Sequence, residues 1–142
     1  MSGYDACMQP QEKSVYVWPS HFPSSCPPTG SLDLVGTAFR FINGSIPVDN
    51  DFTSHYERAP LKSWGNACQA RGLSILHTWG DCGLMRDAVP ALRKKKIAIA
   101  DISTTVGVFA STPSLSCAGH STWWRAIPPD QVRPLFTTFV EP

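Results

Sequence analysis

The chain has 142 residues, a formal net charge of +1, 42% hydrophobic residues and only 16% charged residues. This size and composition are typical of one folded domain and exclude a disordered tail. The near-neutral charge gives no electrostatic footprint for nucleic acid or an anionic membrane surface, and no run of about 18 apolar residues is present to span a bilayer.

Residues 1–31 are predicted to form an extended arm without helices or strands. Proline removes an amide donor and fixes φ, and this segment carries five of the 13 prolines: Pro10, Pro19, Pro23, Pro27 and Pro28. The aromatic residues Tyr16, Trp18 and Phe22 indicate that the arm lies against the rest of the protein. Residues 32–142 are expected to form the domain itself.

The domain is predicted to have an α+β fold, with a mostly antiparallel twisted sheet and two or three short helices. Apolar or alternating segments predict strands at 34–42, 72–78, 97–102, 106–110, 120–127 and 135–140. Capping residues and helical spacing predict helices at 52–58, 81–92 and 130–133. Pro90 should kink the second helix or end it early.

The cysteines are expected to be reduced thiols in the cytoplasm. They are odd in number and widely scattered, and residues 1–7 show neither the basic nor the apolar region of a secretory signal. Cys117 and His120 have the spacing of zinc ligands, but no second close Cys/His pair completes a tetrahedral set. No metal site is therefore predicted among Cys7, Cys26, Cys68, Cys82 and Cys117.

Arg40 is the first candidate functional residue. Alternation along the first strand places it on the same face as Leu34, Ala38 and Ile42, where an arginine must either be paired or face a cleft. It is therefore expected to bind an anionic ligand, or to form a structural ion pair. The carboxylates available for such a pair are Asp33, Asp49 and Asp101.

The segment 71–78 provides two further candidates. Ser74 lies within a predicted strand, where its hydroxyl contacts a ligand or bonds a neighbouring backbone group. His77 closes that strand at a position expected to be accessible to solvent. Both are taken as candidate ligand-binding residues.

His120 is the strongest single candidate. Gly119 permits close approach of another backbone, and Thr122 and Trp124 share the face of His120 by the period of two. The three side chains would form a wall for an aromatic or sugar-like ligand, or His120 would be a satisfied core histidine with its ring nitrogens on carbonyls. His120 and Arg40 are the candidate catalytic residues, although no partner carboxylate is assignable for acid–base work.

Several landmarks together resemble a group of small uncharacterised bacterial proteins. The resemblance covers roughly residues 34–140 and implies a domain type without implying an activity. Its landmarks are Phe39-Arg40, Asp51-Phe52-x-Ser54, Arg71-Gly72-Leu73-Ser74, the strand 97–102 and His120-x-Thr122-x-Trp124.

A more distant resemblance is to the ADP-ribosyltransferase-like fold. It rests on Arg40 in the first strand and on the strand around Ser74 that leads into a helix. The resemblance implies a nicotinamide dinucleotide or phosphate ligand. That family usually relies on a glutamate late in the fold, whereas this chain has only Glu12, Glu57 and Glu141, none of them on a late central strand.

Two functions follow as expectations. The first is a small cytoplasmic accessory or inhibitor protein, bacterial or phage-type, that acts without a cofactor by binding a protein partner; an enzyme is not favoured. The alternative is a cleft formed by Arg40, Ser74 and His120 that binds NAD or another phosphorylated ligand, as in ADP-ribosyl or phosphoryl transferases. Convergence of these three residues in a concave pocket would favour the second function.

Overall fold

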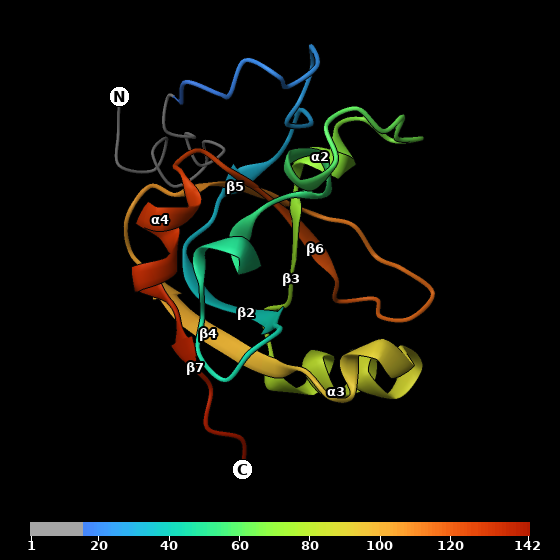
Figure 1. The fold of residues 1–142 in the computed structure, drawn as a ribbon, viewed down its shortest axis with the longest axis vertical. Coiled ribbons are helices and arrows are strands. Elements are labelled where there is room, and N and C mark those ends of the chain that lie inside the picture. Colours follow the sequence, from blue (N-terminus) through green and yellow to red (C-terminus); the bar gives the residue numbers. More distant parts are fainter. Residues whose placement is uncertain (1–15) are drawn as a thin grey trace, which may run out of the picture.

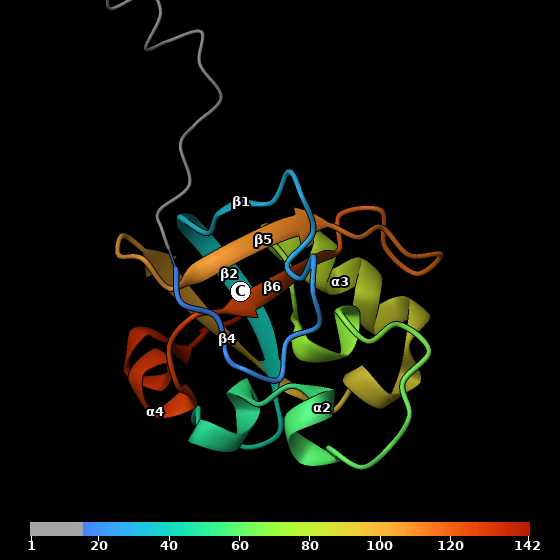
Figure 2. The same ribbon diagram turned by 90° about the horizontal axis from the view of Figure 1, so that it is seen from above.

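The computed structural model describes residues 16–142. In these residues seven strands form two antiparallel sheets, with three short α-helices and four 3-10 helices around them. The predicted α+β fold is thereby confirmed, although the strands form two sheets where one was predicted. The two sheets cross, and Figure 2 shows β2 running across the direction of β5 and β6.

The first sheet contains four strands in the order β1, β5, β6 and β3. Their bounds are Leu32–Asp33, Gly107–Ser111, Ser121–Arg125 and Leu73–Ile75. Every residue of β6 is buried, because β6 lies between two strands and both its faces are covered. The β3–β6 register sets Ser74 opposite Thr122.

The second sheet contains β2 (Gly36–Ile42), β4 (Lys96–Ile102) and β7 (Thr137–Thr138), with β4 in the centre as its apolar sequence indicates. One bridge joins the two sheets. There the backbones of Phe39 and Leu76 exchange hydrogen bonds of 2.8 and 3.0 Å. This bridge brings the middle of β2 to the end of β3, one residue from Arg40.

The helices differ from the prediction mainly at their ends. The predicted helix 52–58 is divided into a 3-10 helix, η1 (Asp49–Phe52), and α2 (His55–Arg58). The division follows from Ser54, whose hydroxyl accepts the N–H of Glu57 while its own N–H donates to the Glu57 carboxylate, so a new helix starts there.

The other predicted helices are present with shifted bounds. α3 (Trp79–Ala88) begins two residues earlier than predicted because Thr78 is its N-cap, and it ends before Pro90. The remaining short helices are η2 (Gln69–Arg71), η3 (Pro90–Leu92), α4 (Pro129–Val132) and η4 (Arg133–Leu135). In Figure 1, α3 lies below β3 and α4 lies beside β4 and β7. No helix among the described residues is both long and apolar enough to cross a membrane.

The main core lies between the two sheets. Trp123 of β6 packs there with Ala38 and Ile42 of β2 and with Ile75 of β3, and all four are almost fully buried. A second buried cluster lies under α3 and includes the two residues of the bridge. Its members are Phe39, Leu76, Cys82, Ile97 and Cys117. The position of the bridge is therefore fixed by apolar packing on both sides.

The described part of the predicted arm, residues 16–31, contains no helix or strand. It lies across the first sheet, where Trp18 and Phe22 pack with Val108 and Trp124. The hydroxyl of Tyr16 also donates to the carboxylate of Asp33 at 2.9 Å. Residues 1–15 of the predicted arm lie outside the described residues.

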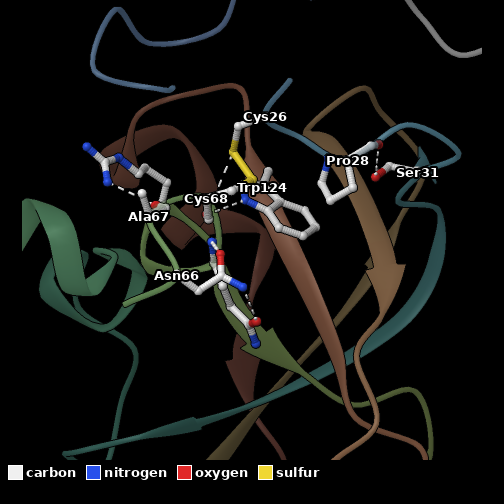
Figure 3. Close-up of a disulfide and its surroundings, with 9 residues drawn as sticks. Cys26, Pro28, Ser31, Asn66, Ala67, Cys68 and Trp124 are labelled. Carbon is white, nitrogen blue, oxygen red and sulfur yellow. Dashed lines mark hydrogen bonds between the residues drawn. A yellow bond between two sulfur atoms is a disulfide. The ribbon is translucent and has the colours of Figure 1, made fainter. Parts of the chain in front are cut away.

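A disulfide corrects the prediction of reduced cysteines. Cys26 of the arm and Cys68, just before η2, are bonded across 42 residues of sequence (Figure 3). Their separation gave no signal, because only the folded chain brings their Cα atoms to 5.5 Å. Cys82 and Cys117 are free and buried, and Cys7 lies outside the described residues.

Candidate functional site

Arg40, Ser74 and His120 converge on one cleft. Arg40 comes from β2, Ser74 from β3, and His120 from the residue before β6, and all three line a cavity of about 240 Å³. A smaller hollow of about 130 Å³ shares Arg40 and Ser74 and is also lined by Thr122. Four of the predicted site residues thus lie around one concave surface.

Arg40 is held by two backbone carbonyl groups. Its Nε donates to the carbonyl of Asp51 at 2.8 Å, and its Nη1 donates to the carbonyl of Ser74 at 2.7 Å. None of the ion pairs among the described residues involves Arg40, so the predicted alternative of a structural ion pair with Asp33, Asp49 or Asp101 does not describe it. Carbonyl groups fix the guanidinium without neutralising its charge.

Burial, together with the nearby guanidinium of Arg58, lowers the pKa of Arg40 to about 10. The side chain therefore remains a cation at neutral pH. A partly desolvated cation that keeps its charge attracts an anion more strongly than an exposed one, since its field is less screened by water.

Further cations line the same cleft. Arg58 and Lys95 contribute permanent charges, and His55 lies beside them. The one carboxylate among the lining residues is Asp51, whose two oxygens accept the backbone N–H groups of Asn43 and Val48 at 3.2 and 2.9 Å. Cations are in excess here, which makes the cleft a site for an anion.

Ser74 and His120 are in direct contact. The Ser74 Oγ and the His120 Nε2 lie 2.9 Å apart, while Nδ1 of the same ring lies 2.9 Å from the carbonyl oxygen of Thr112. Ser74 is exposed to the cleft, whereas His120 is 9% exposed. Both ring nitrogens have partners, but only Nδ1 faces a carbonyl as the core interpretation predicts, whereas Nε2 faces a ligand-accessible hydroxyl.

Hydroxyl groups extend this contact. Thr112 Oγ1 lies 2.8 Å from Thr122 Oγ1 and 2.9 Å from Nδ1 of His120. Gly119 does allow a close approach, but to the carboxylate of Asp81 instead of a backbone: a Cβ at Gly119 would lie 2.2 Å from Asp81 Oδ2. The loop before β6 is thereby held against α3, which orients His120.

His77 lies on the opposite face of the strand pair from Ser74. Its Nε2 lies 3.0 Å from Ser121 Oγ, and its ring packs against Phe109. It does not line the cleft of Arg40, Ser74 and His120. Ser74 and His77 are three positions apart, an odd separation, and this together with the end of the strand accounts for the change of face.

Trp124 does not form the wall predicted for it. It is 1% exposed, its indole N–H donates to the carbonyl of Cys68 at 2.8 Å, and it packs beneath Cys26 of the disulfide (Figure 3). The alternation of β6 was assigned correctly, but the arm covers this end of the face. Of the predicted row, His120 and Thr122 face the cleft next to Ser74, whereas Trp124 does not.

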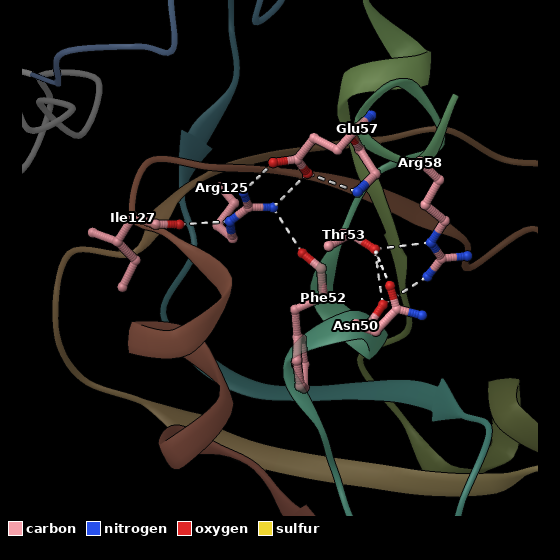
Figure 4. A network of polar contacts seen from close by, with 8 residues as sticks. Asn50, Phe52, Thr53, Glu57, Arg58, Arg125 and Ile127 are labelled. Atoms are coloured by element: carbon pink, nitrogen blue, oxygen red, sulfur yellow. Dashed lines mark hydrogen bonds and ion pairs between the residues drawn. The ribbon is translucent and has the colours of Figure 1, made fainter. Parts of the chain in front are cut away.

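Thr112, His55, Arg58 and Lys95 lie at this site although they are not among the residues predicted for it. The basic run 93–96 was a signal for Lys95. Arg58 and His55 lie in α2, and nothing in their spacing indicates that η1 and α2 lie over β2. Arg58 is fixed there by hydrogen bonds to Thr53 and to the Asn50 carbonyl (Figure 4).

The glutamates of the described residues are engaged outside the cleft. Glu57 forms an ion pair with Arg125 at 2.7 Å (Figure 4), and Glu141 forms one with Arg86 at 2.6 Å. Neither lines the cavity. Glu12 lies outside the described residues.

No cluster of three or more His, Cys, Asp or Glu side chains suited to a metal ion occurs within residues 16–142. Cys117, which has zinc-like spacing to His120, instead points its Sγ toward the carbonyl of Asp81 at 3.9 Å. Burial raises the pKa of the neighbouring Cys82 thiol to about 12, so this thiol is protonated at neutral pH.

Comparison with known proteins identifies no relative: the chain matches no family model, no curated protein and no solved structure.

Proposed function

We propose that the protein binds a phosphorylated small molecule of the nucleotide or dinucleotide class in the cleft formed by Arg40, Ser74 and His120. The observation that carries this proposal is the convergence of the three residues on a cavity that also contains Arg58 and Lys95. The same convergence was the criterion for preferring a ligand-binding cleft over a macromolecular interface.

The chemistry of the lining suits a phosphate. A guanidinium donates two parallel hydrogen bonds to two phosphate oxygens, and the excess of cations offsets the charge of the ligand. Phe39 and Phe41 supply apolar surface to the same cleft, on which a base or nicotinamide ring can pack. The hydroxyl groups of Ser74 and Thr122 are suited to a ribose.

ADP-ribosyl transfer is not part of this proposal. The glutamates among residues 16–142 are paired with arginines away from the cleft, so the glutamate that such transferases use has no counterpart in its lining. The resemblance to the ADP-ribosyltransferase-like fold and the binding of a protein partner both stay predictions.

The compartment is proposed from the disulfide. Bonds such as Cys26–Cys68 persist in oxidising surroundings and are rare in the cytosol. An extracytoplasmic or otherwise oxidising compartment is therefore preferred to the cytoplasm expected from the sequence.

Calorimetric titration with NAD, ADP and inorganic pyrophosphate tests the proposed ligand class. The wild-type protein should bind at least one of them, and Arg40→Ala should weaken that binding by at least about tenfold, because a charge-assisted hydrogen bond contributes about 1.5–3 kcal/mol. The matched control is Arg133→Ala, which removes the same charge from an exposed pair with Asp49 outside the cleft.

Equal affinity of Arg40→Ala and wild type would contradict the proposed site. Absence of binding by folded wild-type protein to all three compounds would contradict the proposed ligand class. Capture experiments for a protein partner would then be the next step.

A further inference from the structure

The contacts of His120 favour one position of its ring proton. Two groups of Thr112 face Nδ1 at 2.9 Å: the carbonyl oxygen, which can only accept, and the hydroxyl, which can accept or donate. A hydrogen on Nδ1 satisfies the carbonyl, whereas an unprotonated Nδ1 would face the carbonyl lone pairs with its own, so the tautomer with the hydrogen on Nδ1 is preferred. In the neutral ring Nε2 is then an acceptor, and the group facing it is the hydroxyl of Ser74, also at 2.9 Å. The Ser74 hydroxyl therefore donates to His120, which is the arrangement of a serine activated by a base.

From this geometry we infer that Ser74 is a nucleophile and His120 its general base, and that the pair transfers a phosphoryl group from a phosphodiester or phosphoanhydride. The Thr112 carbonyl orients the ring, as a third group does in known serine–histidine arrangements. The inference rests on the proposed function, because the same cleft must bind the phosphorylated substrate.

The protein contains a second serine–histidine contact that serves as an internal comparison. Ser121 and His77 lie on the other face of the β3–β6 pair, with Ser121 Oγ and His77 Nε2 3.0 Å apart. Ser121 is only 4% exposed, whereas Ser74 is exposed to the cleft. The distances of the two contacts are alike, so access to substrate and the neighbouring cations are what distinguish Ser74.

The cations beside Ser74 favour phosphorus over a carbonyl carbon as the atom attacked. Arg40 Nη1 bonds the main-chain carbonyl of Ser74 itself, so the guanidinium lies next to the nucleophile. Arg58 lines the same cavity and uses Nε and Nη2 for its own loop. Negative charge that spreads over phosphoryl oxygens in the transition state is stabilised by such guanidinium groups.

The reaction divides into two displacements. In the first, the Ser74 Oγ forms a bond to phosphorus as the bond from phosphorus to the leaving oxygen breaks; the hydroxyl proton moves to His120 Nε2 and from there to the leaving oxygen. In the second, water attacks phosphorus, His120 Nε2 takes a proton from it, and the Oγ–phosphorus bond breaks with return of a proton to Ser74. The sum converts a phosphodiester and water into an alcohol and a phosphomonoester.

A fluorophosphonate probe tests the nucleophile directly. Attack by Ser74 forms an Oγ–phosphorus bond and breaks the phosphorus–fluorine bond, with loss of HF, so mass spectrometry should find one adduct on the peptide containing Ser74. Ser74→Ala should abolish the adduct, and His120→Gln should slow labelling by at least about 100-fold. Ser121→Ala is the matched control and should be labelled at the wild-type rate.

Turnover and binding separate this inference from the proposed function. Wild-type protein should release nitrophenolate from bis(4-nitrophenyl) phosphate, whereas Ser74→Ala should not, although it should still bind pyrophosphate. Pyrophosphate binding by wild type with no adduct, or an adduct that persists in Ser74→Ala, would overturn the inference and leave the proposed function intact. Labelling of Ser74 that depends on His120, without pyrophosphate binding, would support the nucleophile and contradict the proposed ligand class.

Circular dichroism melting of each variant checks that a lost adduct is not a lost fold. Ser74 is exposed, so its truncation is expected to leave the fold unchanged. If His120→Gln unfolds, the Ser74→Ala and Ser121→Ala comparison still decides the question.

Discussion

Arg125 is the side chain that ties the end of β6 to the start of α2. It is 7% exposed, and its guanidinium donates to both oxygens of Glu57 and to the carbonyl of Phe52 (Figure 4). A buried guanidinium with these acceptors is satisfied, whereas removal of the carboxylate leaves its charge uncompensated. The position of α2, and with it Arg58 and His55 of the cleft, depends on this pair.

Glu57→Gln is expected to destabilise the fold by about 2–4 kcal/mol at neutral pH, less than a fully buried pair because the Glu57 side chain is about a quarter exposed. Burial opposes ionisation of Glu57, but hydrogen bonds from Arg125 and Ser54 outweigh it and hold its pKa below the usual 4.5. A carboxyl group whose pKa is lower in the folded state than in the unfolded state stabilises the folded state above pH 4.5. That contribution to the free energy of unfolding is lost as the pH falls through the folded-state pKa.

Urea denaturation at pH 7 and at decreasing acid pH measures both effects. The variant should lose part of the wild-type acid dependence below pH 4.5. Asp49→Asn, which removes the negative charge of the exposed pair with Arg133, should change the free energy of unfolding by less than about 1 kcal/mol. A Glu57→Gln protein as stable as Asp49→Asn would contradict the role given to Arg125.

Sequence patterns predicted the residues of the cleft better than their partners. Arg40, Ser74 and His120 each stood out as polar groups in apolar strands, and that local signal is visible in any strand. The partner of Arg125 lies 68 residues away and the cleft-side partner of His120 lies 46 residues away, so neither pairing leaves a local pattern. Trp124 was misplaced for the same reason, because the arm that covers it is distant in sequence.

At the scale of elements, β5 approaches β6 unusually closely at Gly107. Its φ of +133° is a conformation that favours glycine. A Cβ there would lie 2.1 Å from the carbonyl oxygen of Trp124. The backbone of the central strand β6 cannot move away without disturbing the core on one side and the arm on the other.

Gly107→Ala should therefore destabilise the protein by about 3 kcal/mol or more, since it adds both a steric clash and backbone strain. Gly83→Ala is the matched control: Gly83 lies inside α3 with open space around its Cβ position, and alanine there should stabilise by up to about 1 kcal/mol. Thermal and urea unfolding of the two variants measure the difference, and equal stabilities would disprove the close approach.

Most elements were predictable, and the missing ones have a common cause. β2, β4 and β6 carry alternating or apolar runs long enough to be recognised, whereas β1 has two residues and no pattern. The pairing of the strands into two sheets, which meet at the bridge between Phe39 and Leu76, is set by tertiary contacts that have no sequence signal. The predicted order of strands and helices was therefore sound, but the count of sheets was not.

At the scale of the whole molecule, the disulfide between Cys26 and Cys68 fastens the arm to the domain. It closes a loop of 42 residues, for which the chain-entropy model gives roughly 4 kcal/mol of stabilisation. Cys68 also holds the indole of Trp124 through its carbonyl, so the bond supports the packing of the first sheet.

Reduction of the folded protein should lower its melting temperature by about 10 °C, since a domain of this size loses about 3 °C per kcal/mol. The double variant Cys26→Ser/Cys68→Ser should melt at the lower temperature and should not respond to reductant. A melting temperature that is the same with and without reductant, in protein shown by mass to be reduced, would contradict this role.

The loop closed by the disulfide also divides the cleft between two parts of the chain. Arg40, His55 and Arg58 lie within the covalent ring from Cys26 to Cys68, while Ser74 and His120 lie outside it. The exposed stretch 60–63 belongs to the ring, so hydrolysis of the peptide bond after Lys62 would leave the two fragments attached to each other. In the cleaved molecule the fragment with Arg40, His55 and Arg58 would stay bonded to the fragment with Ser74 and His120 until a reductant broke the disulfide. The protein is therefore expected to tolerate proteolysis at that loop.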